Sequence, residues 1–385
     1  MSSAAAVVLL AVTVGSLVYC GLTLVAARRY LCVRPPAGAP QPPISVLKPL
    51  HGVDEGLEEN LESYFTQDYP AFELLFAARD AGDPALAVVA RLCARHPGVA
   101  ARTFVTGEPP YPNAKVYSLD RMFAGARHDL LVMSDSDVRV SPDLLATVAA
   151  EFADPPLGLA TCPYRAVPGP SIWSTLEAIG LNTEFLSGVL VARLLDGMKF
   201  ALGPTIAARR EVLVRIGGFD RLSRYLAEDF VMGQFAAEAG YGVILSSYVV
   251  EHRIGSQGFA ANVRHRLRWN RSTRRSRPWG YVGQVFTNPL PPAVLMTLLR
   301  PGWWPVLALT VVLRGAAGWA AGIAVLHDPL VRRRWYLMPL QDGVSFLAWL
   351  GGFFGNTITW RGRTYSVKKD GTFERVDGGQ GQGAR

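Results

Sequence analysis

The segment from Ala4 to Ala26 is almost wholly apolar and carries no charged side chain. A helix needs about 20 apolar residues to cross the hydrocarbon core of a bilayer, so this segment is long enough to span a membrane. A cleaved signal peptide is the alternative, but residues 1–10 contain no lysine or arginine, which such a leader carries. Arg28, Arg29 and Arg34 come directly after it, and this positive charge predicts a cytosolic location for the residues beyond the span.

Three further apolar stretches lie in the last third of the chain, at residues 282–299, 303–326 and 344–360. The second contains Arg314, and the first contains several prolines. Basic residues flank all three stretches, and these flanks cannot all be cytosolic if every stretch crosses the membrane. One stretch is therefore expected to be re-entrant or to lie on the membrane surface.

Composition supports a membrane protein. Hydrophobic residues make up 50% of the chain and charged residues 18%, which is apolar for a soluble protein. The formal net charge is +8, and the basic runs border apolar stretches, so an acidic membrane surface is a better partner than nucleic acid. Cys20, Cys32, Cys93 and Cys162 have no zinc-like spacing, and we expect free thiols.

Strands and helices alternate between residues 44 and 280. Short apolar runs predict strands at 44–47, 72–78, 102–105 and 130–133. Asp54, Asp83 and Ser141 precede helical patterns and are expected to cap them. Such alternation predicts an α/β fold with a mostly parallel sheet that helices cover on both faces.

Ligands of such sheets bind beyond the carboxyl ends of the strands. Asp80 and Asp135 each follow a predicted strand end, and they come from different strands. Both can therefore face one crevice.

Asp135-Ser136-Asp137 places two carboxylates on alternate residues, which share a face in extended backbone. Two such carboxylates can hold a divalent ion that in turn clamps a diphosphate. Acidic pairs also occur in solvated turns, so the tripeptide alone leaves both readings open. The buried strand before it favours the functional reading.

A second acidic pair, Glu228-Asp229, precedes a helical pattern. It can cap that helix, or one carboxylate can act as the general base that takes a proton from an acceptor hydroxyl. Lys115 follows Asn113 in a proline-rich loop and can reach a phosphate, or it can be solvated like most loop lysines.

The segment His265–Trp269 combines cations with an indole, which suits a diphosphate and a sugar or lipid headgroup. A basic helix that anchors the chain to the membrane is the alternative. Residues 171–196 are apolar at helical spacing, as in a core helix or in an amphipathic helix beside a lipid acceptor.

Taken in order, these signals make residues 44–275 resemble family 2-type glycosyltransferases of the GT-A fold, and more closely the ceramide glucosyltransferase branch. The likeness is carried by Val46 to Asp54, Asp68-Tyr69-Pro70, Asp83-Pro84-Ala85, Asn113-Ala114-Lys115, Asp135 to Val140, Gly217-Gly218-Phe219, Tyr225 to Asp229, and Arg268-Trp269.

The resemblance implies a role for each acidic and polar motif. Asp80 is expected to contact the uracil or ribose of a UDP-sugar, and Asn113 and Lys115 to contact the nucleotide. Asp135 and Asp137 are expected at a divalent metal, Mg or Mn, and at the diphosphate. Because relatives in this branch can lack the second carboxylate, Asp135 is the primary metal residue.

The catalytic roles also come from the resemblance. It implies that Asp229 is the catalytic base and that Arg268 with Trp269 completes the diphosphate and acceptor site. The family's last motif consists of Gln or Arg, then two residues of any type, then Arg-Trp. This chain has His265 at the first of these positions. This departure concerns the role of His265 and not that of Arg268 and Trp269.

The implied activity is inverting transfer of glucose or N-acetylglucosamine from a UDP-sugar to a hydroxyl of a membrane lipid. Bacterial members act on hopanoid polyols as well as ceramides, so either acceptor is expected. The abundant Ala, Arg and Gly look bacterial, and a multi-pass location in the inner membrane is expected. The alternatives are a processive polysaccharide synthase, which needs several adjoining spans, and a membrane-anchored nucleotide- or lipid-binding protein with a decayed site.

These expectations divide the chain into five parts. They are a transmembrane anchor at 1–29, a linker at 30–43, a cytosolic catalytic domain at 44–280, transmembrane or interfacial helices at 281–360, and a basic cytosolic tail at 361–385 that is partly disordered.

Overall fold

The computed structural model describes residues 3–35, 38–360, 363–368 and 370–376. Within these residues the largest sheet has seven strands. They are β1 (Ile44–Pro49), β2 (Phe72–Ala78), β3 (Ala100–Val105), β4 (Leu130–Ser134), β6 (Leu157–Thr161), β8 (Thr205–Arg209) and β9 (Gly242–Leu245). Their order is β3-β2-β1-β4-β8-β6-β9.

The four strands predicted from the sequence are confirmed, and they pair in parallel. Their apolar side chains are buried on both faces in β1, β2 and β4, as expected for a sheet that helices cover. Strand β8 runs antiparallel to β4 and β6, so the sheet is mixed. Its covering helices are α2 (Leu57–Phe65), α3 (Pro84–Arg95), α4 (Ala114–Gly125), α5 (Leu144–Glu151), α8 (Arg210–Arg215), α9 (Gly218–Leu222) and α10 (Glu228–Glu238).

One of the three predicted helix caps is confirmed. The Asp83 side chain accepts a hydrogen bond from the Ala85 amide at 2.9 Å at the start of α3. The prediction for Asp54 is wrong. Gly56, with φ at 79°, holds the N-cap position of α2, and this helix has no side-chain capping bond.

The prediction for Ser141 is also wrong. Asp143 holds the cap position of α5, and its side chain makes no capping bond. Ser141 instead hydrogen-bonds the Tyr248 hydroxyl at 2.7 Å, a contact across 107 residues that local sequence cannot reveal.

A second sheet consists of β5 (Val138–Arg139), β7 (Tyr164–Pro168) and β10 (Val250–Gly255), in the order β5-β10-β7. Strand β10 pairs antiparallel with β5, and His252 lies opposite Val138 in this register. The pairing brings His252 next to the residues that follow β4.

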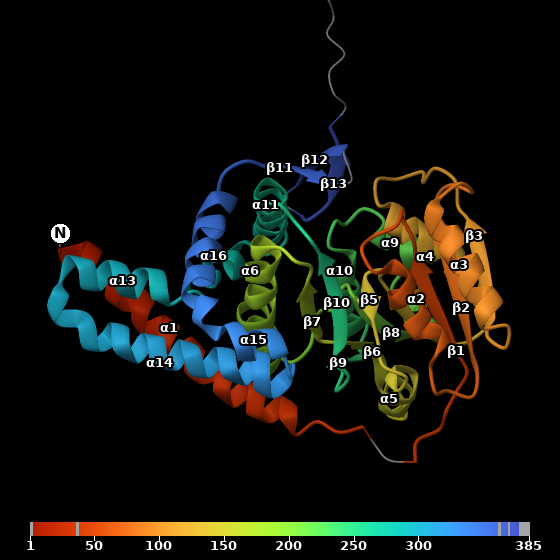
Figure 1. The fold of residues 1–385 in the computed structure, drawn as a ribbon, viewed down its shortest axis with the longest axis horizontal. Helices are drawn as coiled ribbons and strands as arrows, with labels where there is room; N and C mark the ends of the chain where they lie inside the picture. Colours follow the sequence, from red (N-terminus) through yellow and green to blue (C-terminus); the bar gives the residue numbers. More distant parts are fainter. Residues whose placement is uncertain (1–2, 36–37, 361–362, 369, 377–385) are drawn as a thin grey trace, which may run out of the picture.

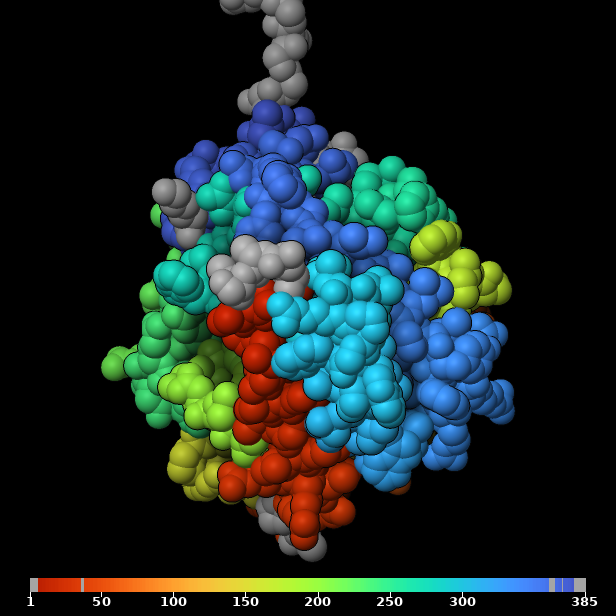
Figure 2. Space-filling view, turned by 90° about the vertical axis from the view of Figure 1, so that its left-hand side faces the viewer, coloured from red at the N-terminus to blue at the C-terminus, as the bar shows by residue number. Residues whose placement is uncertain are grey.

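The remaining helices form the other half of the molecule (Figure 1). They are α1 (Ser3–Leu31), α6 (Ile172–Gly180), η1 (Leu181–Phe185), α7 (Leu186–Asp196), α11 (Phe259–Ser276), α12 (Pro278–Gly283), η2 (Gln284–Phe286), α13 (Leu290–Leu299), η3 (Pro301–Trp303), α14 (Trp304–Gly318), η4 (Trp319–Val325), α15 (Pro329–Arg334), η5 (Trp335–Leu337) and α16 (Met338–Gly352). Figure 2 shows α1, in red, lying against the cyan α13 and blue α14, and α1 contacts both helices.

Among the described residues, three helical stretches are long and apolar enough to cross a membrane: Ala6–Leu31, Ile172–Asp196 and Pro301–Val325. The first and third match apolar stretches identified in the sequence. Residues 171–196 form α6, η1 and α7, and half of this stretch is buried inside the protein. The stretch 344–360 is not one helix, because α16 ends at Gly352 and a strand follows.

Arg314 lies within an apolar helix because it has a partner there. Its guanidinium forms an ion pair with Asp342 of α16 at 2.8 Å and donates to the Thr183 hydroxyl at 3.2 Å. The two charged side chains are only 4% and 0% exposed. This pair fastens α14 to α16 and η1.

The expected basic tail begins with ordered structure. Strands β11 (Thr357–Trp360), β12 (Arg363–Val367) and β13 (Phe373–Arg375) form a third sheet. The Phe373 amide donates to the Arg224 carbonyl at 3.2 Å, so this sheet contacts the loop that precedes α10. The disorder expected for residues 378–385 lies outside the described residues.

Candidate active site

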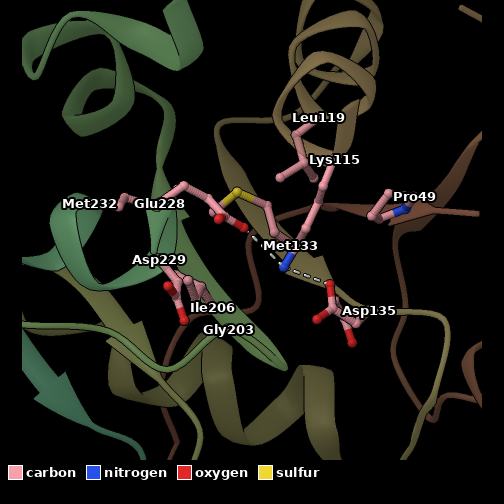
Figure 3. Close-up of a pocket in the computed structure, with 11 residues that line it drawn as sticks. Pro49, Lys115, Leu119, Met133, Asp135, Gly203, Ile206, Glu228, Asp229 and Met232 are labelled. Atoms are coloured by element: carbon pink, nitrogen blue, oxygen red, sulfur yellow. Dashed lines mark ion pairs between the residues drawn. The ribbon is translucent and has the colours of Figure 1, made fainter. Parts of the chain in front are cut away.

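Asp135 lies directly beyond β4, where its carboxylate meets Lys115 from the first turn of α4. The Lys115 amine is 2.7 Å from Asp135 Oδ1 and 3.3 Å from Glu228 Oε1. Figure 3 shows the amine pointing between these two carboxylates, with Asp229 beside them. Three motifs far apart in the sequence therefore meet at one point.

The charge of Lys115 is strongly favoured. Burial disfavours the ammonium form, but the Asp135 and Glu228 carboxylates outweigh this effect and raise the pKa of Lys115. The side chain is 18% exposed, so the cation is held at the wall of a cavity. It is placed to meet an anionic ligand.

Asp137 lies next to His252, a residue that no sequence motif singled out. The distance from His252 Nε2 to Asp137 Oδ2 is 3.2 Å. Burial works against both charges, but their mutual attraction prevails, lowering the pKa of Asp137 and raising that of His252. Only the long-range pairing of β10 with β5 creates this contact, so no local sequence signal could have found it.

Lys48 is a second residue missed from the sequence, although a lysine inside an apolar strand is a usable signal. It is fully buried in β1, and its amine donates to the Asp135 carbonyl at 2.5 Å. The amine also lies 3.8 Å from the centre of the Tyr64 ring. Burial lowers the pKa of Lys48 to about 7. The hydrogen bond from Lys48 thus fixes the position of the Asp135 backbone.

Asp229 follows Glu228 at the start of α10 and lines the same cavity. Burial, and then the neighbouring Glu228 carboxylate, raises the pKa of Asp229 to about 6. Gly203 makes room for the carboxylate, since a Cβ there would come within 2.8 Å of Asp229 Oδ2. A carboxylate with this pKa is suited to accept a proton near neutral pH.

Asn113 does not line the cavity. Its side chain is fully buried, caps α4 by accepting from the Val116 amide at 3.2 Å, and donates to the Tyr225 carbonyl at 3.0 Å. It also donates to Glu228 Oε2 at 3.3 Å. Asn113 therefore joins the Lys115 helix to the loop that carries Asp229.

Arg268 and Trp269 lie on α11, and both line the same cavity. The Trp269 ring stacks edge-on against Phe185 of η1, with the ring centres 6.1 Å apart. The preceding His265 is 2.6 Å from Glu177 of α6. His265 thus ties α11 to α6.

Asp80 is exposed beyond the end of β2, and it is not among the residues that line the cavity. Its neighbour Arg79 lines the cavity and forms an ion pair with Glu108 at 3.2 Å. The residues that line the cavity therefore include Asp135, Asp137, Lys115, Asp229, Arg268 and Trp269, and they do not include Asp80.

The cavity has a volume of about 760 Å³ and joins two chemically different regions. One end is lined by the ionic cluster around Asp135 and Asp229. The other end lies among the apolar helices, where α1, η1, α7 and α16 contribute side chains such as Tyr19, Leu181, Val189 and Trp349. One continuous space therefore reaches from a charged site to the candidate membrane spans.

The residues present fit a divalent cation. Asp135 and Asp137 supply hard oxygen ligands, and Asp137 Oδ1 is buried with no hydrogen-bond partner among the described residues. Within the described part of the chain, no three His, Cys, Asp or Glu side chains are already arranged around one point.

Comparison with known proteins agrees with this geometry. The family model described as "Glycosyl transferase family 21" matches residues 8–373. Ceramide glucosyltransferase 1 of Caenorhabditis elegans is 30% identical over 209 residues, which cover 54% of this chain and 44% of the relative. Ceramide glucosyltransferase 3 of the same organism is 28% identical, with 59% and 50% covered. The chain spans about half the length of these curated relatives.

Among solved structures, a mannosyltransferase from Pyrobaculum calidifontis in complex with GDP-Man and Mn²⁺ has a TM-score of 0.55 and 19% identity. The alignment covers 91% of this chain and 99% of the mannosyltransferase. At this identity the likeness concerns the fold, which confirms the expected GT-A architecture.

Proposed function

Since the chain belongs to glycosyl transferase family 21, we propose that it transfers a sugar from a UDP-sugar to a hydroxyl group of a membrane lipid. The observation that carries this proposal is the continuous cavity between the Asp135 cluster and the apolar helices. A soluble acceptor would not need a path into candidate membrane spans. The curated relatives are ceramide glucosyltransferases, which favours ceramide as the acceptor, and a hopanoid polyol is the second acceptor that we propose to test.

The donor is proposed to bind with its diphosphate beside Asp135 and Lys115. Asp135 and Asp137 would hold a Mg or Mn ion, which when bound supplies positive charge that stabilises the leaving diphosphate. Lys115 and Arg268, which both line the cavity, would add positive charge beside the diphosphate. Asp80 and Arg79 are proposed to contact the uridine of the donor. Asn113 is proposed to affect donor binding indirectly, because its hydrogen bonds hold Lys115 and Glu228 in position.

Asp229 is proposed to be the catalytic base. It takes the proton of the acceptor hydroxyl while that oxygen forms a bond to the anomeric carbon of the sugar, and the bond from this carbon to the UDP oxygen breaks. A single displacement of this kind inverts the anomeric centre. The raised pKa of Asp229, about 6, is close to that of an efficient base at neutral pH.

The proposed location is the cytosolic face of an inner membrane. Arg28 and Arg29 at the end of α1 support this orientation by the excess of positive charge on the cytosolic side. The catalytic sheet would then face the compartment that holds UDP-sugars.

The test is product analysis with membranes that contain the full chain. Membranes are incubated with labelled UDP-glucose or UDP-N-acetylglucosamine and with ceramide or a hopanoid polyol, and the lipids are identified by mass spectrometry. We expect one sugar on one lipid hydroxyl. A long polymer would support a processive synthase instead, and binding of the donor without any transfer would support a non-catalytic protein.

A further inference from the structure

Polar side chains gather at the membrane end of the cavity, away from the ionic cluster. Tyr19 comes from α1, Glu184 from η1, and Thr287 and Asn288 from the turn before α13. All four line the cavity. Polar groups among apolar helices are costly unless they are paired or meet a polar ligand.

Glu184 is partly satisfied by its neighbours. The Asn288 amide nitrogen donates to Glu184 Oε1 at 2.8 Å, and the Thr287 hydroxyl donates to the same oxygen at 3.1 Å. These bonds fix the orientation of the Asn288 side chain, because its nitrogen must face the carboxylate. Its carbonyl oxygen, Oδ1, is thereby turned elsewhere.

Two polar atoms in this cluster have no hydrogen-bond partner in the described part of the chain. They are Asn288 Oδ1 and the Tyr19 hydroxyl, and both are buried. The Asn288 side chain belongs to a residue that is only 2% exposed. Buried polar atoms in folded proteins are rarely left unpaired, so a missing partner that enters through the cavity is a direct explanation.

The local backbone supports a binding role. Glu184 lies in η1, a single π-helical stretch between α6 and α7. Such widened turns often occur at functional sites because they redirect side chains. Gly188 lies one turn later, and a Cβ there would lie 3.7 Å from the Tyr19 hydroxyl, so the absence of a side chain keeps this corner open.

We propose that Tyr19, Glu184 and Asn288 form a subsite that binds the lipid acceptor at the membrane end of the cavity and selects acceptors with a second hydrogen-bond donor. This inference rests on the proposed function. Asn288 Oδ1 and the Glu184 carboxylate accept hydrogen bonds, so the ligand must bring an N–H or a further O–H group. Leu181, Phe185 and Val189 of the same wall offer apolar surface for its hydrocarbon part.

The chemical class of acceptor is therefore an amide-bearing amino alcohol or a polyol, and not a lipid with a single hydroxyl. A site that pairs buried polar atoms with its ligand discriminates against an analogue that lacks the matching group, because those atoms then stay unpaired. Trp269 packs on Phe185 and so connects this subsite to the Arg268 side of the cavity.

The sharpest variant is Tyr19→Phe in the full chain. Since the Tyr19 hydroxyl has no hydrogen-bond partner among the described residues, its removal breaks no hydrogen bond within them. A purely structural role therefore predicts unchanged kinetics. A ligand role predicts a higher KM for an acceptor that uses this hydroxyl.

Membranes with each variant are assayed with a short-chain ceramide and with a primary alcohol of the same chain length. For the wild type we expect a KM at least about tenfold lower for the ceramide. Tyr19→Phe and Asn288→Ala should each raise the ceramide KM about three- to tenfold, and leave the alcohol KM and the KM for the UDP-sugar unchanged.

Thr297→Val is the matched control. Thr297 lies on α13 at the end farther from this turn, its hydroxyl donates to the Ala293 carbonyl at 2.9 Å, and it is not among the residues that line the cavity. It should leave both acceptor KM values at the wild-type level. Thermal unfolding of each variant checks that the protein remains folded.

If Tyr19→Phe changes the KM of both acceptors equally, or of neither, the subsite is overturned. Glycolipid formation by the wild type would still support the proposed function. If the wild type glycosylates neither acceptor nor a hopanoid polyol, the proposed function fails and the subsite fails with it. The two failures are thus distinguishable.

Discussion

Two ion pairs of this protein differ in what surrounds them. Lys115 and Asp135 are 2.7 Å apart at the wall of the cavity, with side chains 18% and 29% exposed. Arg314 and Asp342 are 2.8 Å apart between α14, α16 and η1, with side chains 4% and 0% exposed. The first pair can exchange partners with a ligand, whereas the second is closed.

The contrast shows how burial decides the use of an ion pair. Arg314 donates three hydrogen bonds to Asp342, so each charge saturates the other. Lys115 instead divides its charge between Asp135 and Glu228. Removing one partner of a fully buried pair leaves the other charge buried and unpaired. In a pair at a cavity wall, water or a ligand can solvate the charge that remains.

The largest effect is expected on the catalytic side of this comparison, from Asp229→Asn. Without the base, transfer should fall about 10²–10⁴-fold, while binding of the UDP-sugar stays within about twofold. Rates come from glycolipid formation and affinities from direct binding of the donor. Glu238→Gln, at the exposed far end of α10, is the control and should keep wild-type transfer. Wild-type turnover by Asp229→Asn would exclude Asp229 as the base.

Replacing Arg314 or Lys115 by methionine should affect different properties of the protein. Arg314→Met should destabilise the fold by about 3–5 kcal/mol, because Asp342 is left buried and unpaired. Lys115→Met should cost much less stability, since Asp135 reaches the cavity, but it should weaken donor binding. Thermal unfolding in detergent measures the stability of both variants, and direct binding of the UDP-sugar measures the donor affinity.

The double variant Arg314→Met with Asp342→Leu is the matched control for the closed pair. It should recover most of the stability, since an apolar pair of similar volume can replace a buried ion pair. A loss as large as that of Arg314→Met alone would contradict a purely structural role.

Asp135→Asn should weaken binding of the UDP-sugar by about ten- to hundredfold when Mg or Mn is present. The effect should be smaller when a chelator has removed the metal, and Asp137→Asn should cost less than Asp135→Asn. Calorimetric titration with and without metal measures these affinities. Equal affinity of wild type and Asp135→Asn in the presence of metal would contradict the role of Asp135.

The smallest effect is expected from acidification. Asp229 must be ionised to accept a proton, and its pKa is raised to about 6. The value of kcat/KM should therefore be constant above this pH and fall about tenfold for each unit below it. A pH profile with its midpoint near 4, roughly the usual range of an aspartate, would show that the base lies elsewhere.

The first four strands could be predicted correctly because their apolar runs are local and continuous. The position of Asp135 could also be predicted, since its motif directly follows a strand end. Lys115 was expected in a loop, whereas it lies in the first turn of α4. His252 could not, because only the pairing of β10 with β5 brings this residue to Asp137. Residue order contains no local signal for such a register.

The partner of Arg314 was equally hidden. Asp342 lies in a helix 28 residues away, and only the packing of α14 against α16 joins the two charges. The predicted cap at Asp54 was wrong for a different reason, because Gly56 with its positive φ holds the N-cap position of α2. Lys48 could have been noticed, since an isolated lysine in an apolar strand needs a buried partner.

The most direct test of the proposed mechanism is a structure of the full chain in a lipid nanodisc with a divalent metal, a non-transferable UDP-sugar analogue and a ceramide or polyol lipid. We predict that the diphosphate lies beside Asp135, that the acceptor hydroxyl lies within hydrogen-bond distance of Asp229, and that the contact between Arg314 and Asp342 is unchanged. A nucleotide bound away from Asp135, or a lipid seated outside the cavity, would contradict this mechanism.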